Sequence, residues 1–310
     1  MITSTKILCS GYCTHSNHIT DSSISYWNSE IIKFPSLFVL IQHSKFGNIL
    51  FDTGYSSRFH METELMPYLL YGKLTPVFLK EDESAKEILK VQFGILPEQV
   101  NYIIISHFHA DHISGLRDFP NAKFVFSKEG FKYLKERKQS CCCRDLRCCI
   151  NGFIPNLLPE DFEKRSIQVS ETQFSHHENI IPCFKTFDLF GDGSLFIVDL
   201  PGHCKGHLGC YFTVSTEGFN NKENYKHESV KGTFLLVGDA AWSSNAIINA
   251  SPPHLVTKFL VQYDWNAYCH TLQTLHKLWK EEKNLKIIPS HCWNVYEEYC
   301  GGNIYKVSKL

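Results

Sequence analysis

Short apolar runs separated by glycine- and asparagine-containing turns recur along the chain and predict a core built mainly from β-strands. Residues 36–43 form one such run, residues 45–48 have the composition of a turn, and residues 48–52 form the return run of a hairpin. A glycine-rich turn at 191–193 separates two further runs in the same way. The other strands that we expect lie at 6–10, 102–105, 123–126, 184–187, 195–200, 210–214, 233–237 and 286–289.

Helical spacing of apolar residues is confined to a few segments. Residues 83–93 carry apolar side chains at helical spacing and are followed by Gly94, which favours the end of a helix. We also expect helices at 128–138 and 263–283. The length and apolar content of the chain allow one large domain or two smaller ones, and we expect a single domain over residues 1–310.

Two segments of this domain have no clean periodicity. Residues 55–82 are too rich in aromatic and aliphatic side chains for a solvated linker. They are expected to form a lid over a pocket or a dimer contact, or simply to pack on the core. Residues 139–180 read as an irregular, lid-like insertion that borders the same site, with His176 and His177 expected at the surface.

Composition narrows the class of protein. The chain has 310 residues, of which 43% are hydrophobic and 20% charged, enough for a sizeable core, and its formal net charge is −1. This charge gives no reason to expect a nucleic acid or an anionic membrane as a partner. No apolar run approaches the length of a membrane span, and the N-terminal residues lack the apolar stretch of a signal peptide, so we expect a cytoplasmic protein.

The cysteines are numerous and unevenly spread. Five of the thirteen gather in the segment 141–149, at Cys141, Cys142, Cys143, Cys148 and Cys149. A small disulfide scaffold is excluded by the length of the chain and its apolar content. A structural zinc site is disfavoured because paired C-x-x-C spacing is missing. We therefore expect reduced thiols in a connecting segment.

A concentration of metal-capable side chains follows the buried strand at 102–105. His107, His109, Asp111 and His112 stand within six residues, in the order H-x-H-x-D-H. His107 and His109 are two apart and point the same way in an extended backbone, whereas Asp111 and His112 can begin a helix. One pair can then bind one metal ion while the next pair faces a second ion. Imidazole and carboxylate together suit Zn²⁺, Mn²⁺ or Fe²⁺ better than Ca²⁺ or Mg²⁺.

The same arrangement recurs at the ends of other strands. Four apolar strands each run into a metal-capable residue, namely Ile105 before His107, Leu200 before His203, Val237 before Asp239, and Ile288 before His291. Side chains at strand ends are held by a rigid sheet, which is how functional sites are commonly built.

These motifs, taken together, resemble those of the metallo-β-lactamase-fold hydrolases. Asp52 in Leu-Phe-Asp-Thr-Gly matches the first motif of that superfamily, and the His107–His112 run, His203, Asp239 and His291 match the others in order. The resemblance implies an αβ/βα sandwich of two mixed β-sheets flanked by helices, with the site at one edge of the sheets.

The resemblance also implies a role for each residue. One metal ion would be bound by His107, His109 and His203, the other by Asp111, His112 and His291, and Asp239 would bridge the two. Asp52 would orient a ligand through a hydrogen bond. We expect two divalent ions, zinc foremost and Mn²⁺ or Fe²⁺ as alternatives. They would activate a bridging hydroxide for attack on a carbonyl or phosphoryl centre, with Asp111 passing a proton to the leaving group.

The sequence indicates the type of reaction more clearly than it indicates the substrate. The long segment before H-x-H-x-D-H resembles the acyl-homoserine-lactone lactonase branch, and the apolar segment 55–82 suits a small ester or lactone. A phosphodiesterase of the same fold is the second hypothesis, although no basic tract accompanies the site. An iron-binding redox protein or a non-catalytic member is the third. A homodimer is compatible with each of them.

One residue departs from the lactonase pattern. Those lactonases carry a tyrosine three residues after the bridging aspartate, where its hydroxyl assists ring opening, and here this residue is Trp242. An indole N–H donates a hydrogen bond but does not act as an acid as a phenol does. We expect Trp242 to form a hydrophobic wall of the site.

Overall fold

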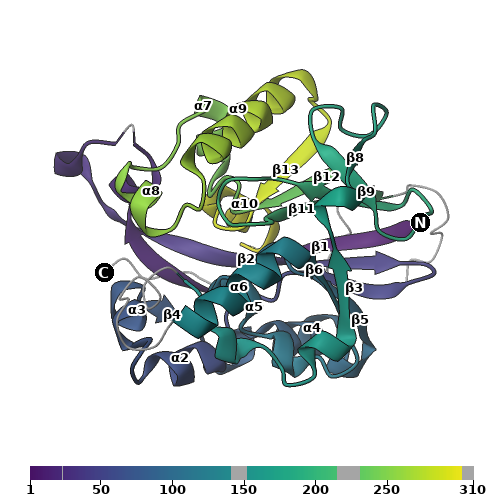
Figure 1. The fold of residues 1–310 in the computed structure, drawn as a ribbon, viewed down its shortest axis with the longest axis horizontal. Coiled ribbons are helices and arrows are strands. Elements are labelled where there is room, and N and C mark those ends of the chain that lie inside the picture. The colour runs from purple at the N-terminus through teal and green to yellow at the C-terminus, as the bar shows by residue number, and fades with distance from the viewer. Residues whose placement is uncertain (23, 141–151, 215–230, 302–310) are drawn as a thin grey trace.

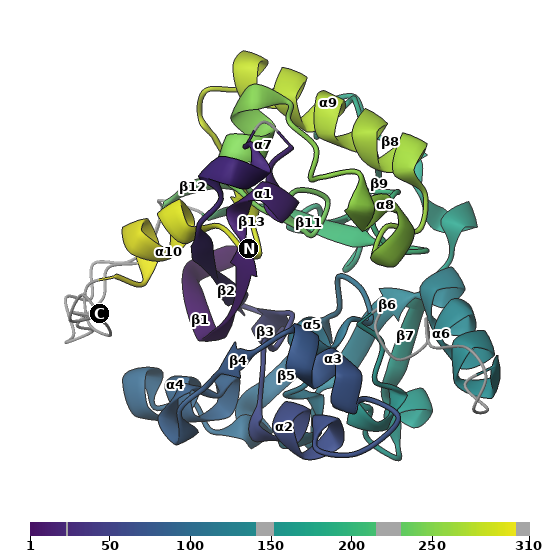
Figure 2. The ribbon, with the colours of Figure 1, turned by 90° about the vertical axis from the view of Figure 1, so that its left-hand side faces the viewer.

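A computed structural model describes residues 1–22, 24–140, 152–214 and 231–301 of the chain. Two layers of β-strands lie against each other, and helices cover their outer faces (Figure 1). In the orthogonal view, α7 (Ser244–Asn249) and α9 (Trp265–Glu281) lie above the strands, whereas α2 (Ser57–Thr63) and α4 (Ala85–Phe93) lie below them (Figure 2). This is the αβ/βα sandwich expected from the sequence.

The N-terminal half supplies one layer of strands. Its order is β7-β6-β5-β3-β2-β1, with β2 antiparallel to both β1 and β3, and with β3, β5, β6 and β7 parallel. The bounds are β1 (Ile2–Ser16), β2 (Ile31–His43), β3 (Gly47–Phe51), β5 (Val100–Ile104), β6 (Lys123–Ser127) and β7 (Ser166–Val169), and the short β4 (Val77–Phe78) pairs with β1.

The C-terminal half supplies the other layer. The ladder β13-β12-β11-β10-β9-β8 is antiparallel except where β12 and β13 run parallel. Its strands are β8 (Ser175–His176), β9 (Lys185–Asp188), β10 (Leu195–Asp199), β11 (Leu208–Val214), β12 (Gly232–Gly238) and β13 (Leu285–Pro289). One pair of residues, Ile2 and Val214, joins this layer to β1 of the first layer.

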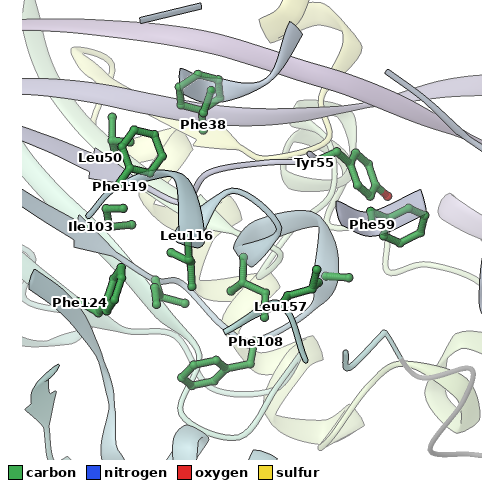
Figure 3. Close-up of a cluster of buried hydrophobic side chains, with 14 of the residues drawn as sticks. Phe38, Leu50, Tyr55, Phe59, Ile103, Phe108, Leu116, Phe119, Phe124 and Leu157 are labelled. Atoms are coloured by element: carbon green, nitrogen blue, oxygen red, sulfur yellow. The ribbon is translucent and has the colours of Figure 1, made fainter. Parts of the chain in front are cut away.

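Apolar side chains fill three spaces, one between the two sheets and one between each sheet and its helices. Ile41, Ile104 and Phe212 belong to the middle cluster, which draws residues from both sheets. A second cluster lies between the first sheet and its helices, and Figure 3 shows Phe38, Ile103 and Phe124 within it. A third cluster lies between the second sheet and α7 and α9. Sheets buried on both faces explain why the strands read as continuous apolar runs.

The remaining α-helices have seven residues or fewer, except for α6 with 13. They are α1 (Asn17–Thr20), α3 (Leu69–Leu74), α5 (Ala110–Ile113), α6 (Lys128–Ser140), α8 (Val256–Leu260) and α10 (Trp293–Tyr299). Among the described residues, no helix is both long and apolar enough to cross a bilayer.

Most elements expected from the sequence are confirmed, and the departures have a common cause. The hairpin at 36–52 and the helix at 83–93 are present, and Gly94 ends α4 with a left-handed φ of 66°. The segment 139–180 was expected to be irregular throughout, but it contributes β7, an edge strand paired with β6, and the two-residue β8. Such short strands carry too little periodic signal to be recognised alone.

The segment 55–82 packs on the core over part of its length. Tyr55 and Phe59 are buried in the cluster between the first sheet and its helices (Figure 3). Tyr68 and Tyr71 belong to the same cluster. Its role as a lid stays a prediction, as does the single-domain boundary. The cysteine cluster at 141–149 lies outside the described residues, so the expectation of reduced thiols there is untested.

Candidate metal centre

The predicted ligands follow four different strands, and the fold brings them together at one place. The chain leaves β5 at Ile104 and presents His107 and His109 before α5, whose first turn carries Asp111 and His112. His203 follows β10, Asp239 follows β12, and His291 follows β13. All seven residues meet at one edge of the two sheets, although they are spread over residues 107–291 of the sequence.

Three imidazoles form the first group. The Nε2 atom of His203 lies 3.1 Å from Nδ1 of His109, so both atoms face the same point. The ring of His107 lies with its centre 4.5 Å from that of His109 and 4.8 Å from that of His203. The structure therefore brings together the residues predicted to bind the first metal ion.

The second group contains two imidazoles and one carboxylate. Nε2 of His291 lies 3.2 Å, and Nε2 of His112 lies 3.5 Å, from Oδ2 of Asp111. Asp239 reaches both groups, because its Oδ1 lies 3.1 Å from His291 and its Oδ2 lies 3.4 Å from His203. Asp239 thus stands between the groups, where a bridging ligand would have to stand.

In three of the imidazoles, the ring nitrogen that points away from the centre contacts an oxygen atom. Nδ1 of His112 lies 2.8 Å from Oδ2 of Asp52, and Nδ1 of His203 lies 3.1 Å from Oε1 of Gln262. Nδ1 of His291 lies 2.8 Å from the carbonyl oxygen of Pro35. An acceptor at the outer nitrogen keeps a proton there and leaves the inner nitrogen as a lone-pair donor, which is the state that binds a metal.

Asp52 occupies the orienting position that the sequence predicts. It is fully buried at the end of β3, and its Oδ1 accepts a hydrogen bond of 2.8 Å from the backbone N–H of Ser106. The Ser106 hydroxyl donates to Oδ2 of Asp52 at 2.7 Å and lies 3.0 Å from Nδ1 of His107. One carboxylate therefore holds both the loop after β5 and the ring of His112.

Burial and mutual repulsion make part of this cluster neutral. Burial, followed by the charge on His203, lowers the pKa of His109 to about 3. Burial and the neighbouring His112 similarly lower the pKa of His107. Burial alone would also lower the pKa of His112, but Asp111 and the other nearby carboxylates raise it to about 10. In the absence of a cation, the carboxylates thus draw positive charge onto the second group.

The donor set fits divalent metal ions. Nε2 of His107 is buried without a hydrogen-bond partner, which is costly unless something else satisfies it. Nε2 of His112 and Oδ1 of Asp239 lie 3.3 Å apart, but neither makes a hydrogen bond of good geometry. Among the described residues, the groups able to hold an ion have ligand atoms within 4.8 Å of one another, and each group includes His107 or His112. Imidazole with carboxylate is a ligand chemistry that suits zinc, manganese and iron.

A pocket of about 310 Å³ opens onto this centre. Its floor includes His109, Asp111, His203, Asp239 and His291. Its walls are mainly apolar and come from several elements, with Phe34, Tyr55, Tyr71, Leu74, Trp242, Val256, Leu260 and Val261 among them. No lysine or arginine lines this pocket within the parts of the chain that the structure describes.

Trp242 both lines the pocket and contacts the centre. Its Nε1–H donates a hydrogen bond of 3.0 Å to Oδ2 of Asp239, and its ring lies edge-on to Phe34 at 6.0 Å. Trp242 is therefore more than the hydrophobic wall expected from the sequence.

Three supporting residues escaped the sequence analysis. Gln262 and Cys204 contact His203 and His109, respectively, and His207 accepts a hydrogen bond of 3.1 Å from the backbone N–H of Asp239. Cys204 and His207 share the strand-end motif of His203, which was an available signal, whereas Gln262 precedes a helix without any pattern that marks it. His176 is exposed and His177 partly so, as expected.

Comparison with known proteins supports this description. The Metallo-beta-lactamase superfamily profile matches residues 32–125. N-acyl homoserine lactonase AttM of Azorhizobium caulinodans is 26% identical over 189 residues, which cover 58% of this chain and 60% of that protein. Probable metallo-hydrolase Rv2300c of Mycobacterium tuberculosis is 33% identical over 181 residues, 54% of this chain and 50% of that protein. The chain thus matches about 60% of the length of the lactonase.

Solved structures extend the likeness to nearly the whole chain. An N-acyl homoserine lactone hydrolase with the product N-hexanoyl-L-homoserine bound at its catalytic metal centre superposes with a TM-score of 0.64 at 17% identity, covering 96% of each chain. AidC, a dizinc quorum-quenching lactonase, gives a TM-score of 0.54 at 16% identity over 94% of this chain and 89% of that one. At such identities the likeness establishes the fold, and it agrees with the resemblance predicted from the sequence.

Proposed function

We propose that this chain is a hydrolase of the metallo-β-lactamase superfamily that uses metal ions to cleave a small neutral ester or lactone. The observation that carries the proposal is the pocket of about 310 Å³, whose walls are apolar and whose floor is the cluster of histidines and aspartates. The named relatives and structural neighbours that are lactonases support the same substrate class.

Seven residues would hold two divalent ions, with zinc proposed first. His107, His109 and His203 would bind one ion, Asp111, His112 and His291 the other, and Asp239 both. When bound, such a pair of ions lowers the pKa of a water to give hydroxide near neutral pH and polarises the carbonyl oxygen.

Asp111 is the residue proposed to move a proton. Its side chain is 14% exposed, against 5% for Asp239, and it borders the pocket while its Oδ2 contacts His291. Burial raises the pKa of Asp111, but His112 and His291 lower that pKa by more than burial raises it. The carboxylate is therefore ionised. It can therefore accept a proton at a carboxylate oxygen and return it to the leaving oxygen of the substrate.

The walls of the pocket select the substrate. Apolar side chains such as Phe34 and Leu260 exclude water from the site and favour an apolar acyl or ring substituent. A phosphodiester carries a negative charge that no lysine or arginine among the described lining residues would balance. The pocket thus favours a neutral carbonyl compound over the phosphodiesterase alternative.

The test is a substrate panel with metal-loaded protein. Lactones and aryl esters of increasing acyl length should be hydrolysed faster than a bis-aryl phosphate, and a chelator should abolish the activity. His109→Ala should lose both one metal ion and the activity. A fully metallated, active His109→Ala protein would contradict the site, whereas faster hydrolysis of the phosphodiester would replace the substrate class.

Elemental analysis settles the metal independently of the substrate. About two equivalents of zinc, manganese or iron per chain is the stoichiometry expected of such a site. Iron accompanied by visible absorbance would favour the redox alternative over a hydrolase.

A further inference from the structure

One histidine of the metal centre is oriented by a thiol instead of an oxygen. The outer nitrogens of His112, His203 and His291 face oxygen atoms, and that of His107 faces the Ser106 hydroxyl. The corresponding atom of His109, Nε2, lies 3.3 Å from Sγ of Cys204. Cys204 directly follows His203 in the sequence, so one strand-end motif supplies both a proposed ligand and this sulfur.

The two nitrogens of His109 have different surroundings. Nδ1 faces Nε2 of His203 at 3.1 Å, in the group proposed to bind the first ion. A nitrogen that binds a metal must offer its lone pair, so the proton of a metal-bound His109 sits on Nε2. That N–H points at Cys204, and a thiol sulfur is a weak hydrogen-bond acceptor.

We propose that Cys204 is a positioning residue whose sulfur accepts a hydrogen bond from Nε2–H of His109 and thereby presents Nδ1 to the metal. The proposal rests on the metal-binding part of the proposed function and is independent of the substrate. In this proposal Cys204 orients a ligand but does not bind the metal itself, although its sulfur lies close to the ligand atoms of the neighbouring histidines.

Packing leaves the His109 ring little freedom to find another partner. A Cβ atom added to Gly152 would lie 2.9 Å from the ring, so the backbone at Gly152 lies directly against it. The ring of Phe153 lies edge-on with its centre 4.7 Å away, and Cys204 itself is only 5% exposed. Water therefore has little access to Nε2, and loss of the sulfur would leave a buried donor without a partner.

The first experiment compares metal affinities by competition with a chelator, using Zn²⁺ alone as the probe. Cys204→Ala should weaken binding of one ion about 10- to 100-fold, the usual effect of removing a group that orients a ligand. Cys204→Ser should restore most of the affinity, because a hydroxyl oxygen also accepts a hydrogen bond. Cys210→Ala is the matched control, since Cys210 is a buried thiol in β11 away from the ligands, and its affinity should match that of the wild type.

The second experiment asks whether the sulfur binds the metal directly, and it needs only the unaltered chain. The Co²⁺-substituted protein should lack the intense thiolate-to-cobalt charge-transfer absorption that a sulfur ligand produces. In the Zn²⁺ protein, the imidazole NMR spectrum should show the proton of His109 on Nε2. A thiolate-to-cobalt band, a proton on Nδ1, or native affinity in Cys204→Ala would each overturn the proposal. None of these readouts depends on hydrolysis, so a wrong substrate class leaves the result unaffected.

Discussion

At the scale of single residues, the centre is defined as much by the atoms behind the imidazoles as by the imidazoles themselves. Asp52, Gln262 and the carbonyl group of Pro35 each occupy the outer nitrogen of one ring. These contacts fix the ring planes before any ion arrives, and they hold a proton on the outer nitrogen when an ion takes the inner one. Preorganisation of this kind reduces the cost of assembling the ligands on binding.

Asp52 makes more contacts than the other residues that orient the imidazoles, so replacing it with asparagine should weaken metal binding. Asp52→Asn keeps the shape but replaces one acceptor oxygen with a donor, facing Ser106 or His112. We expect metal affinity to fall about 10- to 100-fold, as measured by chelator competition. Asp192→Asn, in the exposed turn between β9 and β10, is the control. Equal affinities for the two variants would contradict the role of Asp52.

Trp242 should act on catalysis through Asp239. Trp242→Phe keeps an aromatic wall but removes the N–H that donates to the carboxylate, a hydrogen bond expected to contribute about 1.5–3 kcal/mol. We therefore expect kcat to fall about 10- to 100-fold with a smaller change in KM. Leu260→Ala alters another wall of the pocket without touching Asp239 and should chiefly raise KM. The opposite pattern of kcat and KM would leave Trp242 as a wall only.

The sequence predicts the ligands but not their partners, for a physical reason. His107, His109 and Asp111 stand close together in a spacing that few structural roles would require. The contact between His203 and Gln262 joins residues 59 apart, and that between Cys204 and His109 joins residues 95 apart. Neither partner belongs to a local pattern, so only the folded chain reveals these pairs.

At the scale of elements, the turn after β10 is placed by close backbone packing. Gly202 has a φ of 133°, and a Cβ atom there would lie 2.2 Å from the backbone nitrogen of Tyr268 on α9. The glycine lets the turn approach the helix, and the next residue is His203. The position of one proposed ligand therefore depends on contact between this turn and α9.

Replacing this glycine should affect both the fold and the metal site. In Gly202→Ala, the side chain would push the turn away from α9, and we expect a loss of about 3 kcal/mol or more in the free energy of unfolding, with weaker metal binding. Gly191→Ala is the matched control. It also has a positive φ, 70°, but nothing lies near its Cβ, so about 1 kcal/mol is expected. Denaturant unfolding and chelator competition measure the two effects, and similar losses for both variants would refute the packing argument.

A carboxylate on β10 should make stability depend on pH. Burial, followed by the nearby charge of Glu171, raises the pKa of Asp199 to about 6. The folded state then favours the protonated form, so the contribution of this group to stability is present at low pH and is lost as the pH rises through about 6. Asp199 is partly exposed, which limits the effect to about 1–2 kcal/mol.

The measurement is the free energy of unfolding of metal-free protein at pH 4.5 and pH 7.5. Asp199→Asn should be more stable than the wild type at the higher pH and similar to it at the lower pH. Glu87→Gln on α4 serves as the comparison at both values. An Asp199→Asn protein whose advantage over the wild type does not grow with pH would show that the carboxylate is not desolvated in the folded chain.

Element prediction succeeded where apolar runs are long and failed where packing creates short elements. β12 is marked by the consecutive apolar residues 234–237, and α9 by its length. β7, α7 and α8 have four to six residues each, fewer than periodicity can distinguish from loop. Their conformation is stabilised by neighbouring elements instead of by their own residues.

At the scale of the whole molecule, the centre joins the two halves of the sandwich. Residues 107–112 follow a strand of the first sheet, whereas His203, Asp239 and His291 follow strands of the second. Apart from the middle apolar cluster, the sheets share little backbone pairing, with Ile2 and Val214 as the link between β1 and β11. Bound ions would therefore cross-link the halves. A homodimer stays a prediction.

Metal loading should accordingly stabilise the entire fold. An ion present at 100 times its dissociation constant stabilises the native state by about 2.7 kcal/mol. We expect a rise of several degrees in Tm on adding Zn²⁺ to chelated protein, and a smaller rise for His203→Ala, which lacks one of the ligands. Scanning calorimetry at fixed protein concentration provides the measurement. An unchanged Tm at saturating Zn²⁺ would mean that the ligands do not converge on an ion.

The spread of the ligands from His107 to His291 also has a consequence for biosynthesis. As the chain leaves the ribosome, the H-x-H-x-D-H segment emerges early, but each proposed ion lacks a ligand until a residue from the second sheet has been made. For the ion near Asp111, that residue is His291. Maturation of the centre must therefore be a late event of synthesis, and a nascent chain that captures metal too soon would hold it in an incomplete shell.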